Sequence, residues 1–208
     1  MIVTEASSQI IEFTRLYLAL FYTFVAAFYT VRIITLKRAT GVERVYHGQK
    51  FSANWWHHQI FDVFRVLIWL TCVLRFFFPA MDGYLGLLPG ASSGIVVLIG
   101  DLVLTFGFAS TILVHFYMGK VWASGVNQRG PSKLITSGLY RYSRNPIFIA
   151  ILVSQVGFVL ALPSVFSVVC LVVGVTTILR QVTVEEQHLA QVFPDTYPAY
   201  RNAVPRWV

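Results

Sequence analysis

The sequence has few charged residues: only 12% of its 208 residues are Asp, Glu, Lys or Arg, while 56% are hydrophobic. Soluble domains carry roughly 25% charged residues. This shortage excludes an ordinary soluble enzyme, and the mean hydropathy of +0.67 is typical of an integral membrane protein. The length allows one domain, because about five membrane spans of roughly 20 residues and their connections use it up.

Cysteine is also scarce. The two cysteines, Cys72 and Cys170, both fall in apolar stretches, so we interpret them as small buried residues. They provide neither a disulfide framework nor a zinc-binding pattern, and we expect no metal site. The N-terminal stretch carries Glu5 and Glu12 and no basic leader, which argues against a cleaved secretory signal.

Basic residues are missing from one connection, 79–92, which contains Asp82 and no Lys or Arg. They gather instead in the other polar segments, as Lys37, Arg38, Arg44, Lys50, Lys120, Arg129, Lys133, Arg141, Arg144, Arg180, Arg201 and Arg206. This asymmetry predicts that those segments are cytosolic, with the N-terminus outside and the C-terminus in the cytosol. The net charge of +7 then reflects topology and contact with anionic membrane lipids, so we expect no nucleic-acid partner and no protein partner.

Apolar stretches predict five membrane-spanning helices, at roughly 10–36, 61–79, 91–118, 146–162 and 164–184. The last two are separated only by Pro163 and its neighbours, which predicts a tight helical hairpin. Small residues such as Gly100, Gly107 and Gly157 are typical of closely packed membrane helices. The expected fold is therefore all-α: an integral membrane helical bundle of about five transmembrane helices.

Charged residues inside these spans need an explanation. Arginines near span ends commonly extend to the interface, and we expect this of Arg15, Arg32, Arg65 and Arg75. Asp101 lies within a span, so we expect it to face the bundle interior, where it either lines a substrate cavity or makes a structural hydrogen bond.

The segment Trp55-Trp56-His57-His58 has two interpretations. Adjacent histidines suggest a metal site, but on a helix they point about 100° apart. Tryptophans are enriched at the membrane interface. We therefore interpret the segment as part of an interfacial belt.

The first block whose residues are suited to binding or catalysis runs from Gly138 to Phe148. Asn145 followed by Pro146 is typical of a helix start, with Asn as the N-cap and Pro at the first helical position. The free N–H groups of such a helix bind a carboxylate readily. Just upstream, Tyr140 offers an aromatic face, which suits a planar ring or a cation, and Arg144 supplies a positive charge.

The second block is Glu185-Glu186, directly after the last predicted span. Two carboxylates at a membrane boundary either form a solvated helix end or face the start of the preceding helix, where Arg144 and Asn145 lie. We expect the site of Glu186 to be surface-like. His188, one turn after Glu185, is interpreted as a solvated interfacial residue rather than a catalytic one.

A third block follows the last span. Phe193, Tyr197 and Tyr200 fall at i, i+4 and i+7, which predicts a short amphipathic helix, with Asp195 as its cap and Pro198 in its first turn. Such a C-terminal interfacial helix either anchors the chain to the membrane or covers the site.

In order and spacing, these blocks resemble the S-adenosylmethionine-dependent membrane methyltransferases, the isoprenylcysteine carboxyl methyltransferases and phospholipid methyltransferases. The matching positions are Gly138, Tyr140, Arg144, Asn145, Pro146, Glu185, Glu186, Phe193, Tyr197, Tyr200, Val204, Pro205 and Arg206. The resemblance covers roughly 130–208. The chain departs from the family pattern at Asn145 in place of the frequent His, Phe148 in place of Tyr, Ala150 in place of Gly and Pro194 in place of Gly.

The resemblance implies transfer of a methyl group from S-adenosylmethionine to a lipophilic, membrane-dissolved substrate, whose acceptor is a carboxylate, an amine or a phenol. Residues 1–118 are expected to face the lipid substrate and residues 119–208 to bind the cofactor, in a membrane that we expect to be a bacterial inner membrane. Glu186 and Arg206 are the expected catalytic residues. The expected cofactor-binding residues are Gly138, Tyr140, Arg144, Asn145, Pro146, Phe148, Glu185, Tyr197 and Tyr200.

Two alternatives stay open. Membrane sterol and steroid reductases carry a similar block but use NADPH, and Lys133, Arg141 and Arg144 would have to clamp its extra phosphate. A membrane scaffold without enzymatic activity is the other. The Glu185-Glu186 pair and the Val204-Pro205-Arg206 ending favour the methyltransferase.

Overall fold

The computed structural model describes residues 2–125, 130–131 and 133–208 of the chain. Arg129, one of the basic residues noted above, lies outside these ranges.

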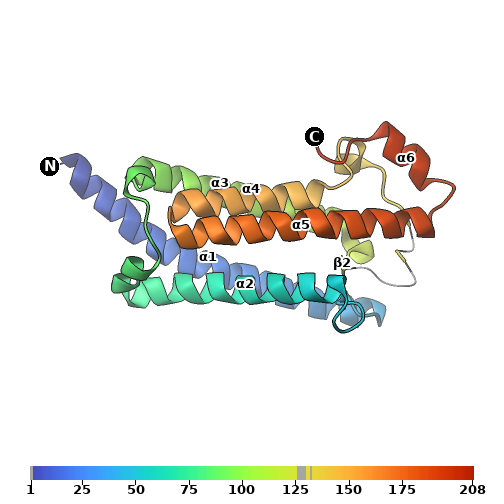
Figure 1. The fold of residues 1–208 in the computed structure, drawn as a ribbon, viewed down its shortest axis with the longest axis horizontal. Helices are drawn as coiled ribbons and strands as arrows, with labels where there is room; N and C mark the ends of the chain where they lie inside the picture. Colours follow the sequence, from blue (N-terminus) through green and yellow to red (C-terminus); the bar gives the residue numbers. More distant parts are fainter. Residues whose placement is uncertain (1, 126–129, 132) are drawn as a thin grey trace.

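Five long helices run alongside one another and form the body of the molecule (Figure 1). A short sixth helix lies at the end where the C-terminus is found. The predicted all-α helical bundle is confirmed. The helices are α1 (Ile2–Thr40), α2 (Ala53–Phe77), α3 (Gly94–Met118), α4 (Pro146–Ala161), α5 (Val165–Val192) and α6 (Tyr197–Ala203).

Short elements occupy the connections. β1 (Val45–Tyr46) and β2 (Ser124–Gly125) pair in parallel, so that the segment after α1 meets the segment after α3. The 3-10 helices are η1 (Pro79–Tyr84), η2 (Pro89–Ala91), η3 (Gly119–Val121) and η4 (Gly138–Arg141). We call the end of the bundle that carries α6 and the C-terminus the site end; η1 and the N-terminus lie at the opposite end (Figure 1).

Three of the described helices, α1, α3 and α5, are long and apolar enough to cross a membrane. The other two predicted spans exist as helices with different properties. α2 has 25 residues but carries Asp62, Arg65 and Arg75, and α4 is apolar but has only 16 residues. Spanning a bilayer takes roughly 20 apolar residues, so length and composition alone support three spans rather than five.

Two predicted helix boundaries are wrong in ways that matter for the site. α5 continues to Val192 instead of ending near Val184, so Glu185 and Glu186 lie within the helix rather than after it. α2 begins at Ala53, because the Ser52 side chain accepts a hydrogen bond from Trp55 N at 3.2 Å and caps the helix. His57 and His58 therefore belong to the first turns of α2.

The close approach of α3 and α4 depends on glycine. A Cβ atom at Gly107 would collide with Ser154 of α4, and one at Gly157 would collide with the backbone at Leu104 of α3. The predicted role of these small residues is thus confirmed. The short turn between α4 and α5 forms the predicted hairpin, although α4 packs most extensively against α3.

Polar residues inside the bundle are paired with one another. Thr14 Oγ1 donates a hydrogen bond of 2.6 Å to Asp101 Oδ2, and Asp101 is only 4% exposed. Asp101 thus makes the structural hydrogen bond that was one of its two expected roles. Arg15 and Arg75 both reach the connection after α2, where they bind Asp82 of η1, and Arg75 is buried.

Candidate functional site

The start of α4 is the first component of the site. Pro146 occupies the first turn of the helix and Asn145 precedes it, as predicted. The Asn145 side chain, however, does not cap the helix. Its Nδ2 donates instead to Glu186 Oε1 at 3.1 Å and to the carbonyl of Arg206 at 3.2 Å. The Asn-Pro pair therefore marks the helix boundary correctly, while the amide side chain serves a tertiary contact.

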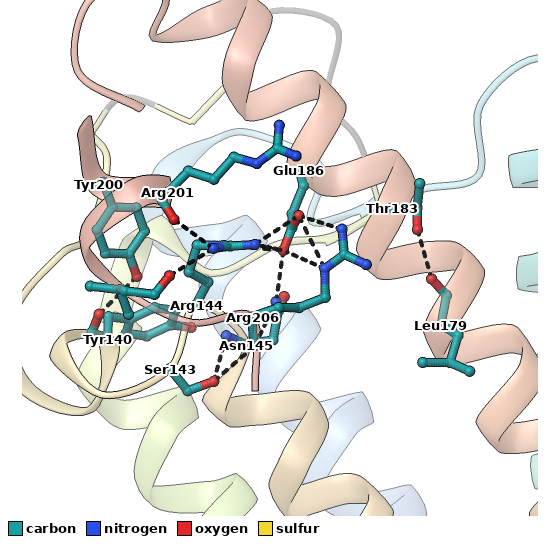
Figure 2. A network of polar contacts seen from close by, with 11 residues as sticks. Tyr140, Ser143, Arg144, Asn145, Leu179, Thr183, Glu186, Tyr200, Arg201 and Arg206 are labelled. Atoms are coloured by element: carbon teal, nitrogen blue, oxygen red, sulfur yellow. Dashed lines mark hydrogen bonds and ion pairs between the residues drawn. The ribbon is translucent and has the colours of Figure 1, made fainter. Parts of the chain in front are cut away.

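Glu186 lies at the centre of a charged cluster (Figure 2). Arg144 Nη2 lies 3.2 Å from Glu186 Oε1, and Arg206 Nη2 lies 2.8 Å from Glu186 Oε2. The Glu186 side chain is only 8% exposed. The expectation of a surface-like position is wrong, because α5 continues past the predicted boundary and the C-terminal segment folds back over the carboxylate.

The same arginine fastens the C-terminal segment. Arg144 Nη1 donates to the carbonyls of Arg201 and Val204 at 2.9 and 2.7 Å, and its backbone N–H donates to the carbonyl of Pro205 at 3.0 Å. Ser143 Oγ donates to the carbonyl of Arg206 at 3.0 Å. Since guanidinium hydrogen bonds to carboxylates and carbonyls are strong and directional, the segment before α4 and the C-terminal tail form one unit.

Helix α6 packs on this unit through its aromatic face. Tyr197, Tyr200 and Val204 form a buried cluster with Leu134 and Leu189. The helix has Pro198 in its first turn as predicted, but Thr196 rather than Asp195 precedes it, and no side chain caps it.

The polar end of the Tyr200 side chain makes a separate tertiary contact. Tyr200 Oη donates to the carbonyl of Tyr140 at 2.8 Å. Since Tyr140 lies in η4, this hydrogen bond joins α6 to the segment that precedes α4.

A cavity of about 730 Å³ lies beside this unit at the site end of the bundle. Its size is in the usual range for small-molecule sites. One wall consists of most of the predicted site residues, namely Tyr140, Arg144, Asn145, Phe148, Glu185, Glu186, Tyr197 and Tyr200. The remaining predicted residues, Gly138, Pro146 and Arg206, do not line the cavity. Pro146 starts α4, and Arg206 binds Glu186 of the wall.

The other wall comes from the first two helices and the segments around β1 and β2. It includes Tyr29 of α1, His57, His58 and Phe61 of α2, and Trp122. Of the segment Trp55-Trp56-His57-His58, the two histidines line the cavity, and Trp56 is 49% exposed.

The tyrosines of the site stay neutral near pH 7. Burial raises the pKa of Tyr140 and of Tyr197, and it raises the pKa of Tyr200 to about 12 although the nearby Arg144 opposes the shift. The hydrogen bonds to Glu186 raise the pKa of the Arg206 guanidinium, which stays charged. Tyr140 and Tyr200 already donate to Met118 Sδ and to the carbonyl of Tyr140, so Tyr197 is the phenol of the three that can donate a hydrogen bond to a ligand. All three are unsuited to accept a proton.

Six residues that line the cavity carry a buried polar atom with no hydrogen-bond partner among the described residues: Arg44 Nε, His57 Nδ1, His58 Nε2, His115 Nδ1, His188 Nε2 and Tyr197 Oη. Buried polar groups in proteins are nearly always satisfied. Such atoms are what a polar ligand in the cavity would satisfy. His188 was interpreted as a solvated residue, and the structure corrects this because it lies on the cavity wall.

Comparison with known proteins agrees with this geometry. The family model of phospholipid methyltransferases matches residues 94–196. The chain belongs to the phospholipid methyltransferase family. A search of curated proteins and a search of solved structures returned no match.

The phospholipid methyltransferase match spans α3, α4 and α5, with the segment from Gly138 to Phe148 and the Glu185-Glu186 pair inside it. It excludes α1 and α2 and ends just before Tyr197. The histidines of α2 and Tyr29 of α1 therefore belong to the part of this family member that the match does not describe. The sequence signal for His57 and His58 was present in the adjacent histidines; Tyr29, in a uniformly apolar stretch, gave none.

Proposed function

We propose that the protein transfers a methyl group from S-adenosylmethionine to a lipophilic substrate at the cytosolic membrane interface. The observation that carries this proposal is the convergence of Arg144, Asn145 and Glu186, all within the family match, on the wall of a cavity at one end of the helical bundle. A polar cofactor and a membrane-dissolved substrate can meet only where the membrane borders the cytosol, and we propose that this end of the bundle lies there.

The residues present fit this cofactor. S-adenosylmethionine, when bound, supplies an electrophilic methyl group on a sulfonium. We propose that Tyr140, Phe148, Tyr197 and Tyr200 provide aromatic surface for it, since aromatic faces attract both planar rings and cations. The unpartnered Tyr197 Oη provides a hydrogen-bond donor.

Glu185 is the second carboxylate of this wall, and we propose that it contacts the cofactor. Gln181 Nε2 donates a hydrogen bond of 2.9 Å to Glu185 Oε1, which holds the carboxylate in place. Both side chains line the cavity. The second carboxylate oxygen of Glu185 is then available to accept a hydrogen bond from a ribose hydroxyl or an ammonium group.

The sequence predicts catalytic roles for Glu186 and Arg206. Their contacts favour a role in positioning other parts of the site over a direct role in proton transfer. Both oxygens of Glu186 already accept hydrogen bonds from Arg144 and Arg206, and Asn145 adds another. A carboxylate held between two guanidinium groups is a poor proton acceptor. We propose that Glu186 and Arg206 hold the tail and the start of α4 in the geometry that the cofactor requires, with Gly138 and Pro146 fixing the backbone on either side.

The membrane orientation is part of the proposal. Basic residues concentrate at the site end, in the segments that follow α1 and α3 and in the tail, which supports a cytosolic site end and an N-terminus outside. The assignment to a bacterial inner membrane stays a prediction from compactness.

The reductase alternative is less well supported by the contacts. It needs basic side chains free to bind the additional phosphate of NADPH, and Arg144 was one of three candidates. Arg144 is instead committed to Glu186 and to the tail carbonyls. Lys133 alone among the remaining candidates lines the cavity.

Methyl transfer from labelled S-adenosylmethionine into a total lipid extract tests the proposed function. We expect the purified protein in detergent to label one lipid class, and mass spectrometry of that product identifies the acceptor atom. The Glu186→Gln variant should lose the labelling, while Glu12→Gln, an exposed carboxylate on α1, should retain it. Equal labelling with and without protein would contradict the proposal.

A further inference from the structure

The chain has five histidines, and all five line the cavity at the site end. They come from different elements: His47 lies beside β1, His57 and His58 on α2, His115 on α3 and His188 on α5. Among the described residues no group of three or more His, Cys, Asp or Glu side chains is arranged to hold a metal ion. The concentration of imidazoles therefore needs another explanation, and proton transfer is the chemistry that histidine performs near neutral pH.

Four of the five, His57, His58, His115 and His188, have a buried ring nitrogen with no hydrogen-bond partner among the described residues, and we single out His58 because its ring also lies against that of His47. The unpartnered nitrogen of His58 is Nε2. The neighbouring Gly125 has a φ of +80°, and a Cβ atom at that position would lie 2.6 Å from His58 Nε2. The absence of a side chain at Gly125 therefore leaves room for the His58 ring at this position.

A partly exposed histidine and its carboxylate partner lie next to His58. The rings of His58 and His47 have centroids 5.2 Å apart, and His47 Nε2 lies 3.6 Å from Asp62 Oδ2. Arg65 holds Asp62 from the other side, where its Nη2 donates a hydrogen bond of 2.6 Å to Oδ1. The side chains of His47 and Asp62 are 39% and 40% exposed, so the histidine beside His58 is in contact with water.

We propose that His58 accepts the proton that the methyl acceptor loses, with His47 and Asp62 as positioning residues, and that the acceptor is a protic nitrogen or oxygen group rather than a carboxylate. This inference rests on the proposed methyl transfer. The acceptor atom forms a bond to the methyl carbon, the sulfur–methyl bond breaks with its electron pair going to sulfur, and the proton of the acceptor goes to His58 Nε2. A carboxylate acceptor is already ionised and would leave this imidazole without a role.

The protonation state of His58 agrees with this assignment. Burial lowers its pKa, and His47, Arg65 and His57 lower it further by charge repulsion, while Asp62 alone opposes them. The imidazole is therefore neutral near pH 7 and able to accept a proton. Several other groups that line this cavity are committed elsewhere: Glu186 is bound by two arginines, Glu185 accepts a hydrogen bond from Gln181 and is assigned to the cofactor, and the tyrosines keep their protons.

A binding measurement tests the inference without turnover. We expect 4-dodecylphenol, a lipophilic phenol, to bind the full-length protein in detergent and to lose about tenfold in affinity in His58→Gln, the size expected for one hydrogen bond. Trp56→Phe, an exposed neighbour on the same helix, should bind as the wild type does. Equal affinity of the wild type and His58→Gln for the phenol would overturn the inference.

Methyl transfer provides the second test. With labelled S-adenosylmethionine, vesicles of phosphatidylcholine are doped with a lipid amine, with 4-dodecylphenol or with a prenylated cysteine. The amine or the phenol should be methylated, and His58→Gln should lower that rate by about 10²-fold, the usual contribution of a positioned base. Imidazole added to His58→Ala should restore part of the rate. Methylation of the carboxylate alone, or an unchanged rate in His58→Gln, would overturn the inference while leaving the proposed methyltransferase intact. No transfer to any acceptor together with no cofactor binding would instead contradict the proposed function.

The positioning role of His47 has its own signature. Since His58 must be neutral to accept a proton, the rate should fall as the pH drops through the pKa of His58. His47→Gln removes a charge that lowers this pKa, so the acid limb of the rate profile should move to higher pH. A merely structural effect of His47→Gln would lower the rate equally at all pH values and contradict the assignment.

Discussion

Two clusters at opposite ends of the bundle share one arrangement, a carboxylate between two arginines. At the site end Glu186 lies between Arg144 and Arg206, at 3.2 and 2.8 Å. At the opposite end Asp82 lies between Arg15 and Arg75, at 2.7 and 2.5 Å. Both carboxylates are largely buried, with side chains that are 8% and 13% exposed.

The surroundings of the two clusters differ. Asp82 joins η1 to α1 and α2, and none of these three side chains lines the cavity. Glu186 also accepts from Asn145, and its partner Arg144 holds the carbonyls of the C-terminal tail beside the cavity. A carboxylate between arginines is thus not a site by itself. One cluster ties helices together, and the other builds the wall on which a ligand can bind.

Among these substitutions, we expect Glu186→Gln to have the largest effect, a loss of cofactor affinity. The substitution leaves two arginines without a counter-charge and weakens the contact by which Arg206 fastens the tail to α5. Breaking a buried ion pair costs about 3 kcal/mol, so we expect the affinity for S-adenosylhomocysteine to fall by about 10²-fold. Isothermal titration of the variant checks this, with Glu12→Gln as the matched control. Wild-type affinity in Glu186→Gln would show that the two clusters are equivalent, both purely structural.

Asp82→Asn should have the opposite pattern. It removes the charge that Arg15 and Arg75 bind, so we expect the free energy of unfolding to fall by about 2 kcal/mol. The affinity for S-adenosylhomocysteine should stay within about twofold, because the cluster is remote from the cavity. Thermal unfolding in detergent and titration of the same preparation measure both quantities. If Asp82→Asn lowered the affinity for S-adenosylhomocysteine by more than its lower stability can explain, the opposite end would be coupled to the site.

The contribution of the Asp82 cluster to stability should also depend on pH. Burial alone would raise the pKa of Asp82, but hydrogen bonds and charges from Arg75 and Arg15 outweigh it, so the pKa lies below the ordinary value of 3.8. A carboxyl group with a lowered pKa contributes stability that is complete above the unfolded pKa and is lost as the pH falls through the folded one. The stability difference between the wild type and Asp82→Asn should therefore be constant above about pH 4 and shrink below it. A constant difference down to pH 2 would contradict the ion-pair explanation.

The smallest expected effect is that of Tyr200→Phe. The substitution removes the hydrogen bond of 2.8 Å to the carbonyl of Tyr140 and leaves the aromatic packing in place. We expect a loss of about 1 kcal/mol in the stability of the docked tail. Hydrogen exchange of the tail measures this local stability, and an unchanged exchange rate would show that packing alone holds α6.

Much of the fold was predictable because apolar stretches and small residues leave a strong signal. The five helices, the hairpin of α4 and α5 and the juxtaposition of Glu186 with Arg144 and Asn145 all follow from where apolar stretches begin and end. The length of α5 did not follow, because polar residues that end an apolar stretch need not end a helix. Helical periodicity continues through Glu185 and Glu186 to Val192.

The second wall of the cavity was beyond prediction for a different reason. His57 and His58 face the cavity only because α2 packs beside α5 with one particular rotation, and a short helix start contains no pattern that fixes this rotation. The burial of Glu186 likewise depends on the tail folding back, a contact between residues far apart in the sequence.

The most direct test of the central claim is the cofactor preference of the purified protein. Isothermal titration in detergent should show binding of S-adenosylhomocysteine to the wild type, strongly reduced binding to Glu186→Gln and no binding of NADPH to either. Binding of NADPH without binding of S-adenosylhomocysteine would contradict the account and identify the protein as a reductase.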